Sequence, residues 1–177
     1  MSSRSRFTAL AAGTVSLGLT LCLPARASGV TTATITIGPG ALAITVPTDA
    51  GNLGTRADSV SGGTISGPLG QVQVTDARGA AAGSAWTATA ISSAFTPPSG
   101  PAIAASAVGY TAGVIAKVGT ATYVANDPLD LTGVSSVVTA TGITGDNSAT
   151  WNPTINVAVP GGMSPGVYSA TITHSVA

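Results

Sequence analysis

The sequence holds almost none of the side chains from which catalytic and metal sites are assembled. Its 177 residues include no glutamate, one histidine, His174, and one cysteine, Cys22. Acid–base and nucleophilic catalysis draw mostly on these residue types, and a zinc site needs three or four such ligands. The composition therefore predicts a protein that is not an enzyme and that binds no cofactor and no metal. A secreted hydrolase that uses aspartate side chains is the weakest alternative.

The first residues have the pattern of an export signal. Arg4 and Arg6 precede an apolar run from residue 7 to residue 23, and an A-x-A cleavage site, Ala25-Arg26-Ala27, follows. The run is too short and too interrupted for a stable membrane span, so a retained anchor is the disfavoured alternative. We predict a secretory signal peptide over residues 1–27 and one domain over residues 28–177. The predicted location is secreted, extracellular or cell-wall associated, with no transmembrane segment in the mature chain.

Removal of residues 1–27 changes the charge balance. Three cations, Arg56, Arg78 and Lys117, remain beside six aspartates, so the net charge of the mature chain is −3. A chain without a basic patch is a poor partner for nucleic acid. The mature chain also has no cysteine, so disulfides cannot stabilise it. Its stability must come from the burial of a core, for which roughly 150 residues suffice.

Hydrophobic residues alternate with polar ones along most of the mature chain, which is typical of strands with one buried face. Gly or Pro interrupts the pattern at short intervals, and helix-favouring residues are scarce. The predicted strands are residues 34–37, 41–46, 71–75, 86–90, 104–110, 114–117, 121–124, 134–139, 154–159 and 167–176. About eight to ten short strands indicate an all-β fold, an antiparallel immunoglobulin-like β-sandwich. A closed barrel is the alternative architecture.

Two stretches of the sequence carry motifs with a characteristic spacing. The first is V-T-D-A-R-G at residues 74–79, followed seven positions after Gly79 by Trp86 and then by Phe95. The second is Y-S-A-T-I-T-H-S-V at residues 168–176. Together they resemble the WxL domain of Gram-positive cell-surface proteins, and the second matches the spacing of the family's closing Y-x-x-x-L-T-W-x-L. Ala88 replaces the leucine of the first W-x-L, His174 stands at the second tryptophan and Val176 at the second leucine.

The resemblance covers residues 66–177 and implies a role as well as a fold. Its implied function is non-covalent association with the cell wall, through peptidoglycan or another wall polymer, or with other surface proteins. The candidate wall-binding residues are Trp86, Trp151, Asp76, Arg78 and His174. The alternative function is a secreted structural or adhesive subunit whose strand edges pair with a partner protein.

Each candidate residue also has a structural interpretation. Asp76 and Arg78 lie two apart on one face of a predicted strand, which favours an ion pair that locks the turn at Gly79. Trp86 shares its side with small residues and is predicted to fill the core, the alternative being an exposed platform for a sugar ring. Trp151 precedes Asn152-Pro153 at a predicted loop rim, where exposure is more plausible.

His174 shares its side with two aliphatic residues, Ile172 and Val176, and is predicted to be half-buried and hydrogen-bonded. A pH switch in adhesion between about pH 5 and 7 is the alternative. Four side chains, Asp127, Asp130, Asp146 and Asn147, offer oxygen ligands for calcium. Their spacing matches no defined calcium loop, so we interpret them as turn residues.

Overall fold

The computed structural model describes residues 32–38 and 40–177, so the predicted signal peptide at residues 1–27 lies outside the described residues. The chain divides into two compact units at Thr36 and Ile37. Residues 32–36, the described part of the first unit, are exposed and form no strand. In the second unit, residues 37–177, the chain forms strands and one short 3-10 turn, η1 (Ala105–Ala107). None of the described helices is long and apolar enough to cross a membrane.

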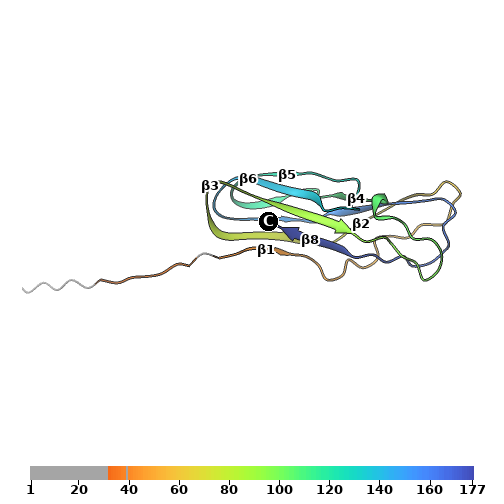
Figure 1. The fold of residues 1–177 in the computed structure, drawn as a ribbon, viewed down its shortest axis with the longest axis horizontal. Coiled ribbons are helices and arrows are strands. Elements are labelled where there is room, and N and C mark those ends of the chain that lie inside the picture. The colour runs from red at the N-terminus through yellow and green to blue at the C-terminus, as the bar shows by residue number, and fades with distance from the viewer. Residues whose placement is uncertain (1–31, 39) are drawn as a thin grey trace, which may run out of the picture. The chain divides into compact units, whose positions relative to one another are not determined.

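The second unit is all-β, and its strands form two antiparallel sheets (Figure 1). The larger sheet has the order β1-β3-β6-β5. β8 also pairs with β3, along residues 88–92, whereas β1 pairs with residues 73–76. The smaller sheet has the order β2-β7-β4. The strands are β1 (Leu42–Thr45), β2 (Gly63–Pro68), β3 (Val72–Ser92), β4 (Val108–Thr111), β5 (Ala116–Ala125), β6 (Ser135–Trp151), β7 (Thr154–Val159) and β8 (Ile172–Val176).

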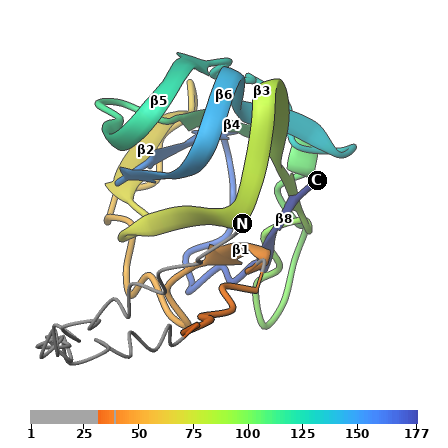
Figure 2. The same cartoon turned by 90° about the vertical axis from the view of Figure 1, so that its left-hand side faces the viewer.

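Two strands are much longer than the short strands we expected. β3 has 21 residues and β6 has 17, and Figure 2 shows β3 bending sharply beside β6. The pairing register shifts between Asp76 and Ala80 and again between Ala80 and Ser84. Gly79 and Gly83 lie in these stretches with φ of 61° and 88°, a conformation that glycine adopts at little cost. The predicted turn at Gly79 is therefore a bulge that bends one continuous strand.

Buried side chains from both sheets form a single core. β3 contributes Val72, Val74 and Trp86, and β7 contributes Ile155 and Val157. Along each strand the buried residues alternate with more exposed ones. The predicted period-2 pattern of residues 71–75, 86–90 and 154–159 is confirmed.

Other strand predictions were wrong in particular places. Residues 34–37 form no strand, and Ile35 and Ile37 are each 88% exposed. β2 was not among the predicted strands, because its Gly-Thr-Ile-Ser-Gly-Pro sequence resembles a turn. Of the strand predicted at residues 167–176, only Ile172–Val176 form a strand, β8.

Candidate functional site

A buried hydrogen-bond network surrounds Trp86 on β3. Its indole Nε1 donates to Asn147 Oδ1 on β6 at 3.0 Å, and the Tyr123 hydroxyl of β5 donates to the same oxygen at 3.2 Å. Asn147 Nδ2 donates to Asp76 Oδ2 at 3.2 Å. The Arg78 guanidinium then holds both carboxylate oxygens of Asp76, at 2.8 and 3.0 Å. This Trp86 network joins three neighbouring strands of the larger sheet.

The predicted ion pair between Asp76 and Arg78 is confirmed. The Asp76 side chain is fully buried, whereas the Arg78 side chain is 38% exposed. Hydrogen bonds from Arg78 and Asn147 stabilise the carboxylate and hold the pKa of Asp76 below its usual value, against the opposing effect of burial. Asp76 and Asn147 face each other directly across β3 and β6, so the pair also fixes the register next to the bulge.

A second network surrounds Trp151 at the end of β6. Its indole Nε1 donates to the Tyr110 hydroxyl of β4 at 2.8 Å, which links the two sheets. The Tyr110 hydroxyl also lies 3.3 Å from His174 Nε2 on β8. The Tyr110 and His174 rings meet edge to face, with centroids 5.7 Å apart. Burial raises the pKa of Tyr110, so this Trp151 network holds a neutral phenol.

His174 is the one member of this network whose hydrogen bonding is incomplete. Among the described residues, none partners its buried Nδ1 atom. Burial lowers the pKa of His174 to about 4 because a charged imidazole is poorly solvated there. The predicted half-buried, hydrogen-bonded imidazole is confirmed. A folded-state pKa of about 4 lies below the range of pH 5 to 7 in which we had considered an adhesion switch.

Neither tryptophan forms an exposed platform. Trp86 is 1% exposed, which confirms the core interpretation, and Trp151 is 2% exposed, so the expected exposure of Trp151 was wrong. Trp151 ends β6 and does not begin a strand at a loop rim. Its ring packs in the core between the sheets, where Tyr110 satisfies the indole N–H.

The aspartates weighed as calcium ligands accept hydrogen bonds from backbone amides. Asp127 binds the amide of Ala112 at 2.7 Å, and Asp130 binds that of Thr132 at 2.7 Å. Asp146 binds the amide of Gly79 at 2.8 Å, next to the β3 bulge. Asn147 belongs to the Trp86 network, so these four side chains do not converge on one point. No group of three or more His, Cys, Asp or Glu within the described ranges is arranged to hold a metal ion.

The outer face of the larger sheet presents rows of uncharged side chains that are mostly polar, although the exposed Val118 and Val124 of β5 end two of the rows. Residues paired across neighbouring strands share a face, and the pairs on the side away from the core are mostly threonine and serine. One row joins Thr87 of β3 to Thr139 of β6, and the next joins Ser175 of β8 to Thr89 and Ser136. Two further rows, Gln73 with Thr150 and Thr75 with Ser148, follow beyond the bend. We call these positions the hydroxyl face.

Sequence reasoning missed the hydroxyl face, although the alternation that predicted the strands contained it. Each threonine in Trp86 to Ala90 lies between two buried residues. Which threonines lie side by side depends on pairing between segments that are far apart in the sequence, such as β3 with β6 and with β8. Alternation within one strand does not predict this pairing.

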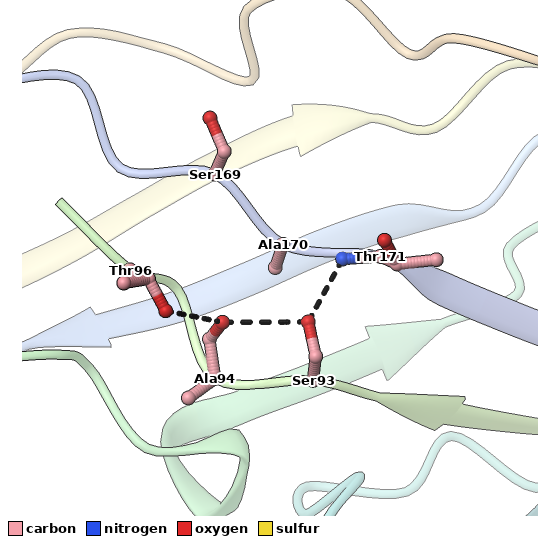
Figure 3. A pocket seen from close by; sticks show the side chains of 6 residues that line it. All are labelled: Ser93, Ala94, Thr96, Ser169, Ala170 and Thr171. Carbon is pink, nitrogen blue, oxygen red and sulfur yellow. Dashed lines mark hydrogen bonds between the residues drawn. The ribbon is translucent and has the colours of Figure 1, made fainter. Parts of the chain in front are cut away.

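Two shallow hollows lie where the paired rows end. One, of about 390 Å³, is lined by Thr45, Val46, Pro47, Gln71 and Gln73. The other, of about 280 Å³, is lined by Ser93, Ala94, Thr96, Ser169, Ala170 and Thr171, where the chain leaves β3 and approaches β8 (Figure 3). In the second, Ser93 Oγ accepts the amide hydrogen of Thr171 at 2.9 Å. The lining residues supply hydrogen-bond donors and acceptors but no acid or base.

The sequence also contains a G-x-S-x-G pattern that the sequence analysis overlooked, at residues 162–166. A nucleophile elbow places this serine between a strand and a helix. Here Ser164 lies in the loop between β7 and β8, with no helix after it. Its carbonyl accepts a hydrogen bond from the Tyr168 hydroxyl at 2.8 Å, so the serine belongs to a structured loop.

No protein-family model, no curated protein and no solved structure matches this chain.

Proposed function

We propose that this protein is a secreted, non-catalytic, WxL-like protein with an immunoglobulin-like sandwich fold, which associates non-covalently with a cell-wall polymer such as peptidoglycan. The hydroxyl face makes the contact. The observation that carries the proposal is that the residues paired in rows across this face are uncharged and mostly hydroxylated.

The chemistry of the face suits a polymer of sugar units. Hydroxyl groups both donate and accept hydrogen bonds, so they match a ligand that also carries many hydroxyls. Neighbouring strands lie roughly 4.8 Å apart, and residues on one face repeat roughly every 7 Å along a strand. A regular array of weak contacts favours a repeating ligand, because many contacts act together.

The tryptophans serve this function indirectly. Trp86 and Trp151 hydrogen-bond inside the core, so they position the strands that carry the face and do not touch the polymer. Asp76 and Arg78 do the same at the bend of β3. We therefore assign a positioning role to all five candidate wall-binding residues, His174 included.

The test removes hydroxyls without changing the shape of the side chains. Thr75→Val, Thr87→Val and Thr89→Val together should weaken co-sedimentation with isolated walls by about tenfold or more, because each lost hydrogen bond is worth about 0.5–1.5 kcal/mol. β-Branched valine also suits a strand, so the melting temperature should change little.

The matched control makes the same three changes on the smaller sheet, at Thr64, Thr111 and Thr154. Thr111 and Thr154 pair across β4 and β7, and Thr64 lies on β2. This control should bind walls like the native chain. Equal binding by all three proteins would refute the proposal.

A further inference from the structure

The segment just before β1 has the sequence of a strand but forms none. Thr34, Ile35, Thr36 and Ile37 are all β-branched, and β-branched residues favour strands. Ile35 and Ile37 are each 88% exposed. Isoleucines spaced two apart would both lie on one face of a strand, so the segment offers an apolar edge that nothing in the described ranges covers.

The segment is not suited to continue β1 along β3. In β1 the even-numbered residues Leu42 and Ile44 pack against the core. An unbroken continuation would place the odd-numbered Ile35 and Ile37 on the outer, solvent side of the sheet. The isoleucines therefore need an edge elsewhere.

β5 provides the longest free edge of the larger sheet. Within the described ranges it pairs only with β6. Its first half is protected in two ways that discourage strand addition. Lys117 pairs with the buried Ala149 and so lies on the inner face, and the register shifts around Gly119, whose φ is 90°.

The second half of β5 has no such protection. Thr122 to Ala125 pair with β6 in regular register. Tyr123 and Ala125 point inward and are only half-buried. A four-residue strand added here would place two inward side chains beside them, and residues 34–37 supply two isoleucines at that spacing.

We propose that residues Thr34–Ile37 of one molecule add as a strand to the Thr122–Ala125 edge of a second copy of this chain. Ile35 and Ile37 then cover the half-buried Tyr123 and Ala125, and Thr34 and Thr36 extend the hydroxyl face of the neighbour. Donor and acceptor lie at different places on the chain, so the contact is head-to-tail and produces a series of oligomers. The pairing needs no wall polymer and goes beyond the proposed wall binding.

Light scattering after size-exclusion chromatography tests the pairing on the full chain over a range of concentrations. The native chain should show a mass that rises with concentration through several species. Ile35→Asp with Ile37→Asp should abolish this rise, because two carboxylates would be buried at the edge. Thr34→Asp with Thr36→Asp adds the same charge on the solvent side of the added strand. This variant should retain most of the rise in mass with concentration. An equal mass for all three proteins would overturn the proposal.

Disulfide trapping tests the location of the edge. In a Cys22→Ser background the chain has no thiol, so mixing a Thr36→Cys chain with a Val124→Cys chain should give a mixed dimer. A Thr173→Cys chain carries its thiol on the exposed part of β8, at the other end of the sheet order, and should give little. Equal trapping by Thr173→Cys and Val124→Cys would refute β5 as the acceptor. Neither measurement involves walls, so its failure would leave the wall-binding proposal intact.

Discussion

Trp86 and Trp151 lie in the same core, but their indole N–H groups lead to networks of different chemistry. The Trp86 network passes through Asn147 to an ion pair whose arginine reaches solvent. The Trp151 network is neutral and passes through Tyr110 to a histidine whose second ring nitrogen has no partner among the described residues.

The difference shows how each network responds to its surroundings. The Trp86 network is charge-assisted, and its carboxylate keeps its charge down to acidic pH because the pKa of Asp76 is lowered. The Trp151 network depends on a neutral imidazole, which a fall in pH converts to a cation in the unfolded chain first. The Trp86 network should therefore be sensitive to mutation of Asn147, its hub, through which its hydrogen bonds pass. The Trp151 network should be sensitive to pH.

The largest effect is expected when the hub of the Trp86 network is removed. Asn147→Ala leaves the indole N–H of Trp86 and the hydroxyl of Tyr123 without their shared acceptor. An unsatisfied buried group costs about 1–3 kcal/mol, and the Tyr123 hydroxyl keeps its bond to the Ser148 carbonyl at 3.4 Å. We therefore expect the free energy of unfolding to fall by about 3 kcal/mol in urea titrations. Asn156→Ala, at a partly exposed asparagine of β7, is the control and should cost less than about 1 kcal/mol. A loss as small for Asn147→Ala would show that the network contributes little.

Acid should destabilise the protein through the Trp151 network. The pKa of His174 is about 4 in the folded chain, against an ordinary value of 6.5, so the unfolded chain binds a proton first as pH falls. Stability is fully present above pH 6.5 and declines toward pH 4, by at most about 3 kcal/mol. Tyr110, the titratable group in contact with His174, stays neutral throughout because its pKa is raised.

Urea titrations at several pH values measure this decline. In His174→Gln the slope between pH 6.5 and 4 should disappear. Asp76 is separated from it, because the stability that Asp76 contributes is lost only as pH falls below 3.8. The same slope in native and His174→Gln proteins would assign the acid sensitivity to another group.

A smaller effect is expected at the solvent end of the Trp86 network. Arg78→Ala removes hydrogen bonds to a buried carboxylate, but Asn147 and the amide of residue 78 still bind Asp76. The melting temperature should fall less than in Asn147→Ala, and wall binding should change less than stability. Unchanged melting with lost wall binding would instead place Arg78 in the binding surface.

The sequence predicted the buried faces better than it predicted where strands end. Alternation identified Val72, Val74 and Trp86 as inward because a strand side chain's direction depends on local geometry. Gly79 was taken as a turn, since a glycine that bends a strand and one that ends it look alike in sequence. Residues 34–37 have the strand pattern, but a strand also requires a partner edge, which alternation does not supply.

The candidate residues show the same limit. Both partners of the Asp76–Arg78 pair lie two positions apart, so their contact was predictable. Asn147, the hub of the Trp86 network, lies 71 residues from Asp76 and 61 from Trp86. It had been considered only as a turn residue or a calcium ligand, because its partners depend on the pairing of β3 with β6.

Wall co-sedimentation of two variants, at a temperature where both are folded, tests most directly whether binding lies on the hydroxyl face and not on the tryptophans. The first, Trp86→Phe with Trp151→Phe, removes both indole N–H groups but keeps aromatic rings in the core. The second is the triple Thr→Val variant at Thr75, Thr87 and Thr89. We predict that the first melts at a lower temperature and still binds walls, whereas the second melts normally and loses binding. Lost binding in the folded tryptophan variant, with native binding in the threonine variant, would contradict the account.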